Sequence, residues 1–179
     1  MRRFYFFALL FPLLCVSCSQ NRIDGAFRSA TPNPVQEDDR PEIAYNKKKI
    51  ALENESINLF IKRYGWKPEI TSTGLRIEIL RDGNGALLKE GDKVVLKYET
   101  KLLSGEIVYH WQTDSVKRFI VNKSEEIAGL HEAARQLKLG SKARLIIPSY
   151  LAYGLAGDGN RIVGCEPLVM TVEVVESRD

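Results

Sequence analysis

Two histidines and three cysteines are the residues best suited to metal binding or nucleophilic chemistry in this chain of 179 residues. His110 and His131 fall in different predicted elements, and neither has a cysteine or carboxylate beside it at ligand spacing. A zinc site needs several such ligands grouped in space, so we expect surface histidines and no metal site. Cys165 lies in a predicted loop without a basic motif that would activate its thiol. We expect a passive thiol there.

Cys18 is placed for a different chemistry, the attachment of a lipid. The chain begins with a short positive segment and continues with an apolar run over residues 4–16. This layout is typical of a secretory signal peptide, and the run is too short to span a bilayer as a helix. The segment LLCVSC at residues 13–18 resembles a bacterial lipobox, so we predict a lipoprotein signal peptide over residues 1–17 and lipidation of Cys18. An ordinary signal peptide or an uncleaved anchor is the alternative.

The charge balance argues against a polyanionic partner. Removing residues 1–17 takes away Arg2 and Arg3 and no acidic residue, so the formal net charge falls from +3 to +1. Proteins that bind nucleic acid neutralise many phosphates with clustered Lys and Arg, and the sequence has no basic patch with interleaved aromatic residues. We therefore expect no nucleic-acid partner. Only Cys165 would remain as a free thiol, which excludes an intramolecular disulfide.

The elements that would position any site begin after a tether. Residues 18–40 hold few large apolar residues and are predicted to be flexible. A helical segment is predicted over residues 41–66, and Pro41 suits its first position because the missing N–H is harmless there. The apolar residues of this segment form two stripes about half a turn apart, namely Ile43, Ile50, Ile57 and Ile61, and Tyr45, Leu52 and Leu59.

A single surface helix normally shows one apolar stripe. The segment is therefore either gripped on two sides or broken near Glu53-Asn54 into two shorter helices. We expect a cap that packs on its own domain. A homodimer formed through residues 41–64 is the alternative.

Beyond Pro68 the apolar period changes from about 3.6 residues to about 2 residues. One amphipathic helix, from Ile127 to Leu137 with Gly140 after it, interrupts the alternating segments. Strands with hairpin links and one helix indicate an α+β domain. We predict, over residues 72–179, an antiparallel twisted sheet of about five strands wrapped around one helix. The alternating segments lie at residues 75–79, 94–99, 107–111, 119–121, 143–147 and 168–174.

Several motifs of this domain occur in the order found in the FKBP family: GDKVVLKY at 91–98, LLSG at 102–105, EIAGLHEA at 126–133, and LGSKARLIIP at 139–148 leading to LAYG at 151–154. The chain resembles FKBP-type peptidyl-prolyl cis-trans isomerases, in particular the gliding-motility-type FKBP lipoproteins of Bacteroidetes. The resemblance implies an FKBP-like fold and an isomerase that needs no metal or organic cofactor.

The reaction explains which residue types the site requires. An X–Pro bond isomerises slowly because rotation sacrifices amide resonance, with a barrier of about 18–20 kcal/mol. The twisted amide is less dipolar than the planar one, so an apolar site favours it relative to water. A catalyst therefore needs a dry pocket for the proline ring and a hydrogen-bond donor for the displaced carbonyl.

The resemblance assigns Tyr153 as this donor, with Tyr98 and Ile127 lining the proline pocket. Phe119 and Ile162 also match the family, whereas Lys117 stands where another aromatic is common, and residues 158–165 differ from the usual loop. Three further positions differ while keeping an apolar or aromatic character: Val108-Tyr109 in place of Phe-Asp, Leu130 in place of a frequent Trp, and Met170 in place of an aromatic. The predicted site comprises Tyr98, Val108, Tyr109, Phe119, Ile127, Leu130, Tyr153, Ile162 and Met170.

These features predict an isomerase that assists the folding of exported proteins in the cell envelope. Its substrates would be proline-containing segments of exported polypeptides, and its membrane contact would be the lipid on Cys18. Ser19-Gln20 lacks an acidic retention signal, which favours the outer membrane facing the periplasm. The alternative function is a catalytically weak FKBP-like binding module or chaperone in an envelope or motility assembly.

Overall fold

The computed structural model describes residues 40–110, 112 and 116–178, and the predicted signal peptide, Cys18 and the tether up to residue 39 lie outside them. Within these residues no helix has the length and apolarity needed to cross a bilayer. The elements are α1 (Pro41–Tyr64), β1 (Glu69–Ile70), β2 (Arg76–Arg81), β3 (Lys93–Leu102), β4 (Ile107–Tyr109), β5 (Val116–Ile120), α2 (Ala128–Ala134), β6 (Lys142–Ile147), the 3-10 helix η1 (Ser149–Leu151) and β7 (Leu168–Arg178).

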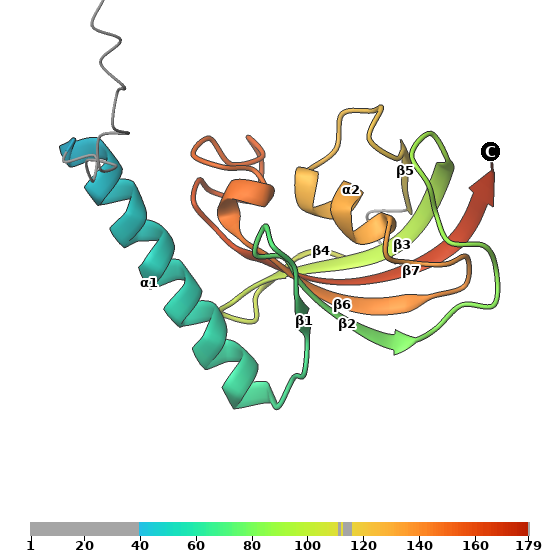
Figure 1. Ribbon diagram of the computed structural model, residues 1–179, viewed down its shortest axis with the longest axis horizontal. Coiled ribbons are helices and arrows are strands. Elements are labelled where there is room, and N and C mark those ends of the chain that lie inside the picture. The colour runs from blue at the N-terminus through green and yellow to red at the C-terminus, as the bar shows by residue number, and fades with distance from the viewer. Residues whose placement is uncertain (1–39, 111, 113–115, 179) are drawn as a thin grey trace, which may run out of the picture. The chain divides into compact units, whose positions relative to one another are not determined.

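All seven strands join one antiparallel sheet in the order β1-β2-β6-β7-β3-β4, with β5 paired to β3. The long strands β3 and β7 form its centre and pair from Lys93 opposite Arg178 to Leu102 opposite Leu168. Figure 1 shows α2 lying on one face of the curved sheet. The predicted α+β fold, an antiparallel sheet around one helix with a helix before it, is confirmed.

Two details of the domain differ from the prediction. The sheet has seven strands instead of about five: six of them correspond to the alternating segments of the sequence, and the two-residue β1 also pairs. The helix predicted to reach Leu137 ends at Ala134, and a tight turn follows in which the Leu137 N–H donates to the Ala134 carbonyl at 2.9 Å. Leu137 is nevertheless 1% exposed. The apolar spacing therefore predicted correctly that Leu137 is buried, but the backbone at this residue is not helical.

The approach of α2 to β6 depends on Gly129. A Cβ atom at this position would lie 2.4 Å from Cγ2 of Ile147 and 3.2 Å from the Leu151 carbonyl oxygen. Such contacts are well inside van der Waals distance, so any larger residue would push α2 away from the sheet. Glycine at this position therefore lets α2 and the end of β6 enclose a shared core.

The helix α1 is continuous through Glu53 and Asn54, so the alternative of two shorter helices broken there is wrong. It ends at Tyr64 and is capped by Gly65, whose φ of 63° is the left-handed conformation that glycine adopts most easily. Only Ile57 of this helix is fully buried, in a second apolar cluster whose other members are Ile146, Val169, Phe60, Ile61, Trp66 and Leu103. The carboxyl-terminal part of α1 is therefore packed on its own domain as a cap.

The second stripe of α1 is exposed within the single chain. Tyr45, Leu52 and Leu59 have exposed fractions of 66%, 55% and 61%. Among the described residues, the domain therefore contacts α1 on one side only, and the second apolar stripe has no partner there. The homodimer through residues 41–64 stays a prediction.

Candidate functional site

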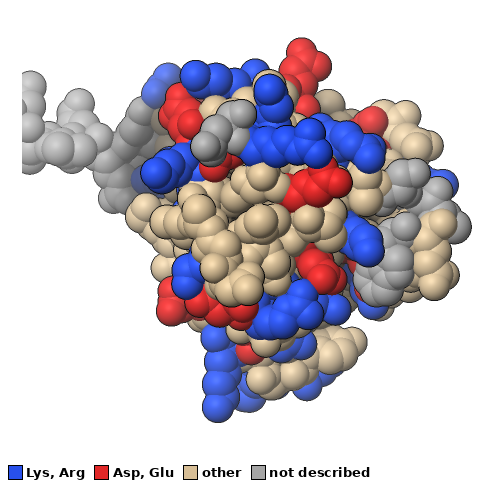
Figure 2. Space-filling model, turned by 90° about the vertical axis from the view of Figure 1, so that its right-hand side faces the viewer, with Lys and Arg blue, Asp and Glu red and all other residues tan. Residues whose placement is uncertain are grey.

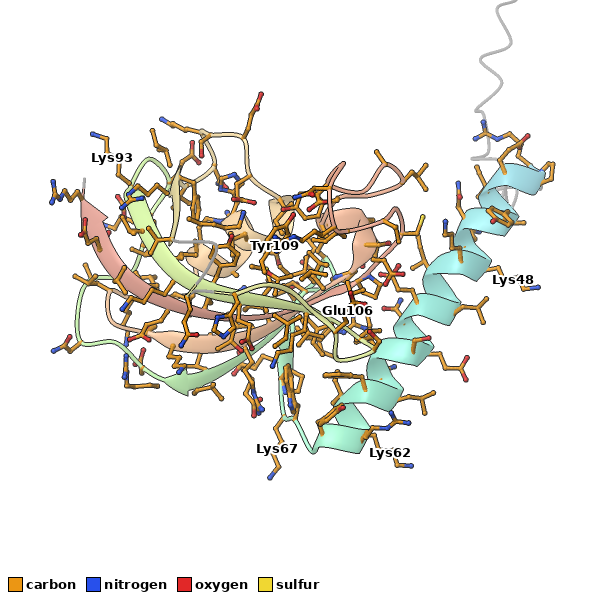
Figure 3. All side chains as sticks on the ribbon, turned by 180° about the vertical axis from the view of Figure 1, so that it is seen from behind. Lys48, Lys62, Lys67, Lys93, Glu106 and Tyr109 are labelled. Atoms are coloured by element: carbon orange, nitrogen blue, oxygen red, sulfur yellow. The ribbon has the colours of Figure 1, made fainter. Side chains whose placement is uncertain are left out.

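The nine side chains predicted for the site come together in one apolar cluster between α2 and the sheet. Tyr109 and Tyr153 are partly buried and pack against it, and Tyr109 lies among the side chains that fill this space in Figure 3. The others have exposed fractions of 7% or less: Tyr98, Val108, Phe119, Ile127, Leu130, Ile162 and Met170. The structure leaves none of the nine outside the cluster.

Strand alternation places the sheet-borne members on one face. Residues two apart along a strand share a face, so Tyr98 on β3 lies in the same buried row as Val94 and Leu96. Thr100, next in this row, is opposite Tyr109 of β4 and Met170 of β7. The helix α2 closes the other side with Leu130, which is 0% exposed.

Tyr153 is the member of the site best placed to act on a substrate. Among the residues that the structure describes, its hydroxyl has no hydrogen-bond partner. Burial raises the pKa of the Tyr153 hydroxyl above its ordinary value of 10.0, and the carboxylates of Glu126 and Asp158 raise it further. The hydroxyl therefore remains protonated through neutral and mildly alkaline pH, and it can donate to a carbonyl oxygen.

Lys117 and Glu126 form an ion pair at the rim of the cluster. The Lys117 Nζ lies 2.8 Å from Oε2 of Glu126 and 5.2 Å from the centroid of the Tyr98 ring. The other oxygen of Glu126 accepts the backbone N–H of Ile127 at 3.0 Å. The cation at the position of a family aromatic is thus neutralised by a neighbouring carboxylate and does not project alone into the apolar space.

Asp158 supplies a carboxylate that was not assigned from the sequence. Its Oδ2 accepts the hydroxyl of Tyr109. Its Oδ1 accepts the backbone N–H groups of Asn160 at 2.9 Å and of Ile162 at 2.8 Å. One side chain therefore holds two predicted site residues, Tyr109 from β4 and Ile162 from the loop after η1. The acid that the family carries after its first hairpin is absent there, and a carboxylate reaches Tyr109 from another element instead.

The electrostatics of Asp158 agree with these contacts. Partial burial raises the pKa of the Asp158 carboxyl, but the hydrogen bond from Tyr109 and those from the backbone of Ile162, Asn160 and Arg161 lower it more. The net pKa lies below the ordinary value of 3.8. Arg161 also joins this loop to β4, because its guanidinium donates to the Val108 carbonyl at 2.6 Å. Asp158 is therefore ionised at neutral pH and fixes the loop against β4.

A local signal for this network exists in the sequence. Asp158-Gly159-Asn160 is typical of an Asx turn, in which an aspartate side chain accepts an N–H two residues later. The sequence gives no sign of the partner Tyr109, which is 49 residues away.

The two histidines are partly buried and engaged by the protein, so the surface positions expected for them are not observed. His131 Nδ1 accepts the N–H of Asn122 at 3.0 Å, and its Nε2 lies 3.1 Å from the Ser124 carbonyl oxygen, which requires the hydrogen on Nε2. His110 Nε2 lies 3.2 Å from a Glu99 carboxylate oxygen. No cluster of three or more metal-binding side chains occurs in the described part of the chain.

A hollow of about 560 Å³ on the opposite face of the sheet is a poor alternative site. Lys97, Arg118 and Lys142 line it together with Glu173. An amide that becomes less dipolar as it twists gains nothing from such a charged lining. The apolar cluster around Tyr98 is the better candidate for a proline-binding site.

Comparison with known proteins identifies the family. The model of the FKBP-type peptidyl-prolyl cis-trans isomerases matches residues 85–175, just over half of the chain. The chain belongs to this family. The matched residues contain every member of the predicted site, so the FKBP resemblance found in the sequence is confirmed.

The relatives of this FKBP-type chain include two proteins of Escherichia coli K12. The FKBP-type 22 kDa peptidyl-prolyl cis-trans isomerase is 36% identical over 111 residues, which are 59% of this chain and 51% of the relative. The isomerase FkpA is 32% identical over 120 residues, which are 65% of this chain and 42% of FkpA. The chain therefore spans about half the length of the curated relatives it matches.

Solved structures show the same fold beyond the residues matched by the family model. The crystal structure of Escherichia coli FkpA superposes with a TM-score of 0.63 at 28% identity, covering 76% of this FKBP-type chain and 64% of that chain. A peptidyl-prolyl cis-trans isomerase from Pseudomonas syringae gives a TM-score of 0.59 at 25% identity, covering 74% of this chain and 96% of that chain.

Proposed function

We propose that this chain is a peptidyl-prolyl cis-trans isomerase that assists the folding of exported proteins in the bacterial cell envelope. The observation that carries the proposal is Tyr153, whose protonated hydroxyl has no partner within the described residues and borders an apolar cluster built at FKBP-family positions. A hydroxyl donor beside a dry aromatic and aliphatic surface is the combination that rotation about an X–Pro bond requires.

In this mechanism the proline ring packs against Tyr98 and Ile127, and Leu130 forms the floor beneath them. The amide twists in a surrounding of low polarity, which disfavours the planar, more dipolar ground state. Tyr153 donates its hydroxyl to the carbonyl oxygen that rotates out of the amide plane. No bond is broken and no proton is transferred, so the site works by binding the twisted form more tightly than the planar form.

A protease-coupled assay on a proline peptide tests this function. We expect the wild-type chain to accelerate isomerisation, and Tyr153→Phe to lower kcat/KM by about three- to tenfold, since one hydrogen bond of about 0.5–1.5 kcal/mol is removed. Tyr64→Phe is the matched control, because it removes a hydroxyl from an exposed ring of α1 and should leave the rate unchanged. If the wild-type chain gives no acceleration, the alternative holds: a binding module or chaperone in an envelope or motility assembly.

The proposed substrates are proline-containing segments of exported polypeptides. On the face shown in Figure 2, Lys and Arg side chains are interspersed with Asp and Glu. Opposite charges are also paired in the domain, as Arg81 is with Glu173 at 2.7 Å. This mixed surface supports a polypeptide client more than nucleic acid, which selects continuous positive surfaces.

We further propose a lipoprotein form, anchored through Cys18 to the outer membrane and facing the periplasm, like the gliding-motility-type FKBP lipoproteins of Bacteroidetes. The support is the short apolar run ending at Cys18 and the absence of acid in Ser19-Gln20. Metabolic labelling with a palmitate analogue is expected to mark the wild-type chain and Cys15→Ser, but not Cys18→Ser. Labelling of Cys18→Ser, or its loss in Cys15→Ser, would contradict the assignment.

A further inference from the structure

The helix α1 lies outside the residues matched by the family model, yet it contacts the segment that carries Tyr153. Lys49, Glu53 and Ile57 are spaced four residues apart, so they share one face of the helix. Ile57 is 0% exposed and fixes this face against β6 and β7 through Ile146 and Val169. Figure 1 shows α1 running alongside the loops that follow β6, and Figure 3 shows Lys48 and Lys62 projecting away from the sheet.

Glu53 binds the start of the Tyr153 segment with both carboxylate oxygens. Oε1 accepts the backbone N–H of Ser149 at 2.7 Å, and Oε2 accepts its hydroxyl at 2.5 Å. Ser149 opens η1 and is 8% exposed. Hydrogen bonds from an N–H or a hydroxyl to a charged carboxylate are shorter and stronger than neutral ones. This contact therefore fixes Ser149 more firmly than an ordinary turn residue.

Ser149 in turn determines the backbone around Tyr153. Its carbonyl oxygen accepts the N–H of Ala152 at 3.1 Å and the N–H of Gly154 at 2.9 Å, the two residues that flank Tyr153. A displacement of Ser149 is therefore passed directly to the Tyr153 backbone.

A second contact reaches the other end of the same segment. The Lys49 Nζ lies 2.6 Å from Sγ of Cys165, and the Cys165 N–H donates to the Gly154 carbonyl at 2.7 Å. Residues 149–165 carry Tyr153, Asp158 and Ile162, so α1 holds both ends of the stretch that closes the site.

We infer that Glu53 is a positioning residue of the isomerase site, which acts through Ser149 to aim the Tyr153 hydroxyl. The helix is thus part of the catalytic unit as well as a cap. The inference rests on the proposed isomerase function. It places a determinant of activity 100 residues before Tyr153 in the chain, on an element that the family model does not include.

Glu53→Gln tests the inference, with Glu55→Gln as the matched control on the exposed side of the same helix. We expect Glu53→Gln to lower kcat/KM by about three- to tenfold. The decrease should be no larger than that of Tyr153→Phe, because Glu53 acts only by orienting the Tyr153 hydroxyl. The decrease should fall on kcat with KM little changed, since the donor acts mainly in the twisted state. Glu55→Gln should match the wild type.

Combining the substitutions separates positioning from general destabilisation. In the Tyr153→Phe background, Glu53→Gln is expected to change kcat/KM by less than about twofold, because residues acting through one group are not additive. An equal loss in both backgrounds would overturn the inference, as would a Glu53→Gln rate equal to that of Glu55→Gln.

Hydrogen exchange gives a readout that does not depend on catalysis. The amide protons of Ala152 and Gly154 should exchange faster in Glu53→Gln than in Glu55→Gln, because both bonds to the Ser149 carbonyl loosen. Unchanged exchange would overturn the positioning role whether or not the wild-type chain is active. A wild-type chain without isomerase activity but with faster exchange in Glu53→Gln would refute the proposed function and leave the mechanical link standing.

Discussion

Ile57→Ala is expected to lower the free energy of unfolding by about 2–5 kcal/mol, the range for truncating a fully buried aliphatic side chain to Ala. Ile57 is 0% exposed and joins α1 to Ile146 of β6 and Val169 of β7. The cavity left by its truncation is bordered by two central strands of the sheet, which cannot collapse onto it easily. The loss should therefore approach the upper part of this range.

Chemical denaturation measures this effect, with Leu59→Ala as the control. Leu59 lies two residues further along α1 and is 61% exposed, so the same change in side-chain volume should shift stability by no more than about 0.5 kcal/mol. Equal effects of the two substitutions would show that α1 is not docked on the domain in solution. A change in denaturant midpoint without a change in slope would show that stability fell while the surface exposed on unfolding stayed the same.

Asp158→Ala is expected to destabilise the chain by about 1–3 kcal/mol, because three groups lose a charged acceptor at once. These groups are the Tyr109 hydroxyl and the N–H groups of Asn160 and Ile162. The residues they hold border the site, so we also expect a lower kcat/KM on proline peptides.

The pH dependence of this effect has a defined sign. The folded-state pKa of Asp158 lies below the ordinary value of 3.8, so its ionised form stabilises the fold above that pH. As the pH falls from 3.8 through the folded-state pKa, the wild-type chain loses this contribution and Asp158→Ala does not. The stability difference between the two proteins should therefore shrink in acid.

Asp82→Ala is the matched control for this experiment. Asp82 pairs with Lys138 at 2.6 Å, but its side chain is 58% exposed. Exposed ion pairs contribute at most about 1 kcal/mol, and Asp82 is not part of the site. A loss in Asp82→Ala as large as in Asp158→Ala, or a difference that persists unchanged in acid, would argue against the Asp158 network.

The sheet could be predicted because apolar and polar residues alternate along β3, β6 and β7. This alternation indicates that one face of each strand is buried, and it can be read from each strand alone. The sequence predicted nine side chains that the structure brings together in one cluster, because the FKBP motifs that carry them are collinear. It could not predict Asp158 bonded to Tyr109 or Glu53 bonded to Ser149, which are 49 and 96 residues apart. Such polar contacts between residues far apart in the sequence leave no periodic pattern, and a charged side chain is usually solvated.

The double stripe of α1 misled the prediction for a physical reason. The polar pair Glu53-Asn54 suggested a break between two amphipathic patterns, but these side chains form hydrogen bonds to the domain. Glu53 reaches Ser149, and the Asn54 Oδ1 accepts from Arg76 at 2.8 Å. Arg76 is 5% exposed, so Asn54 provides an acceptor for one nitrogen of a buried guanidinium. Polar residues in the middle of the docked face resembled a linker in the sequence.

The packing of Ile57 against Val169 also sets an order of events during synthesis. Chains emerge from the amino terminus, and contacts between residues far apart in sequence form late because a long loop must close first. The apolar face of α1 emerges before its partners on β6 and β7, which follow after all the strands from β1 to β5. Until then Ile57, Phe60 and Ile61 have no partner on the sheet. Among the described elements, α1 therefore completes its packing only after β7 has emerged, and in that interval its docked apolar face is exposed.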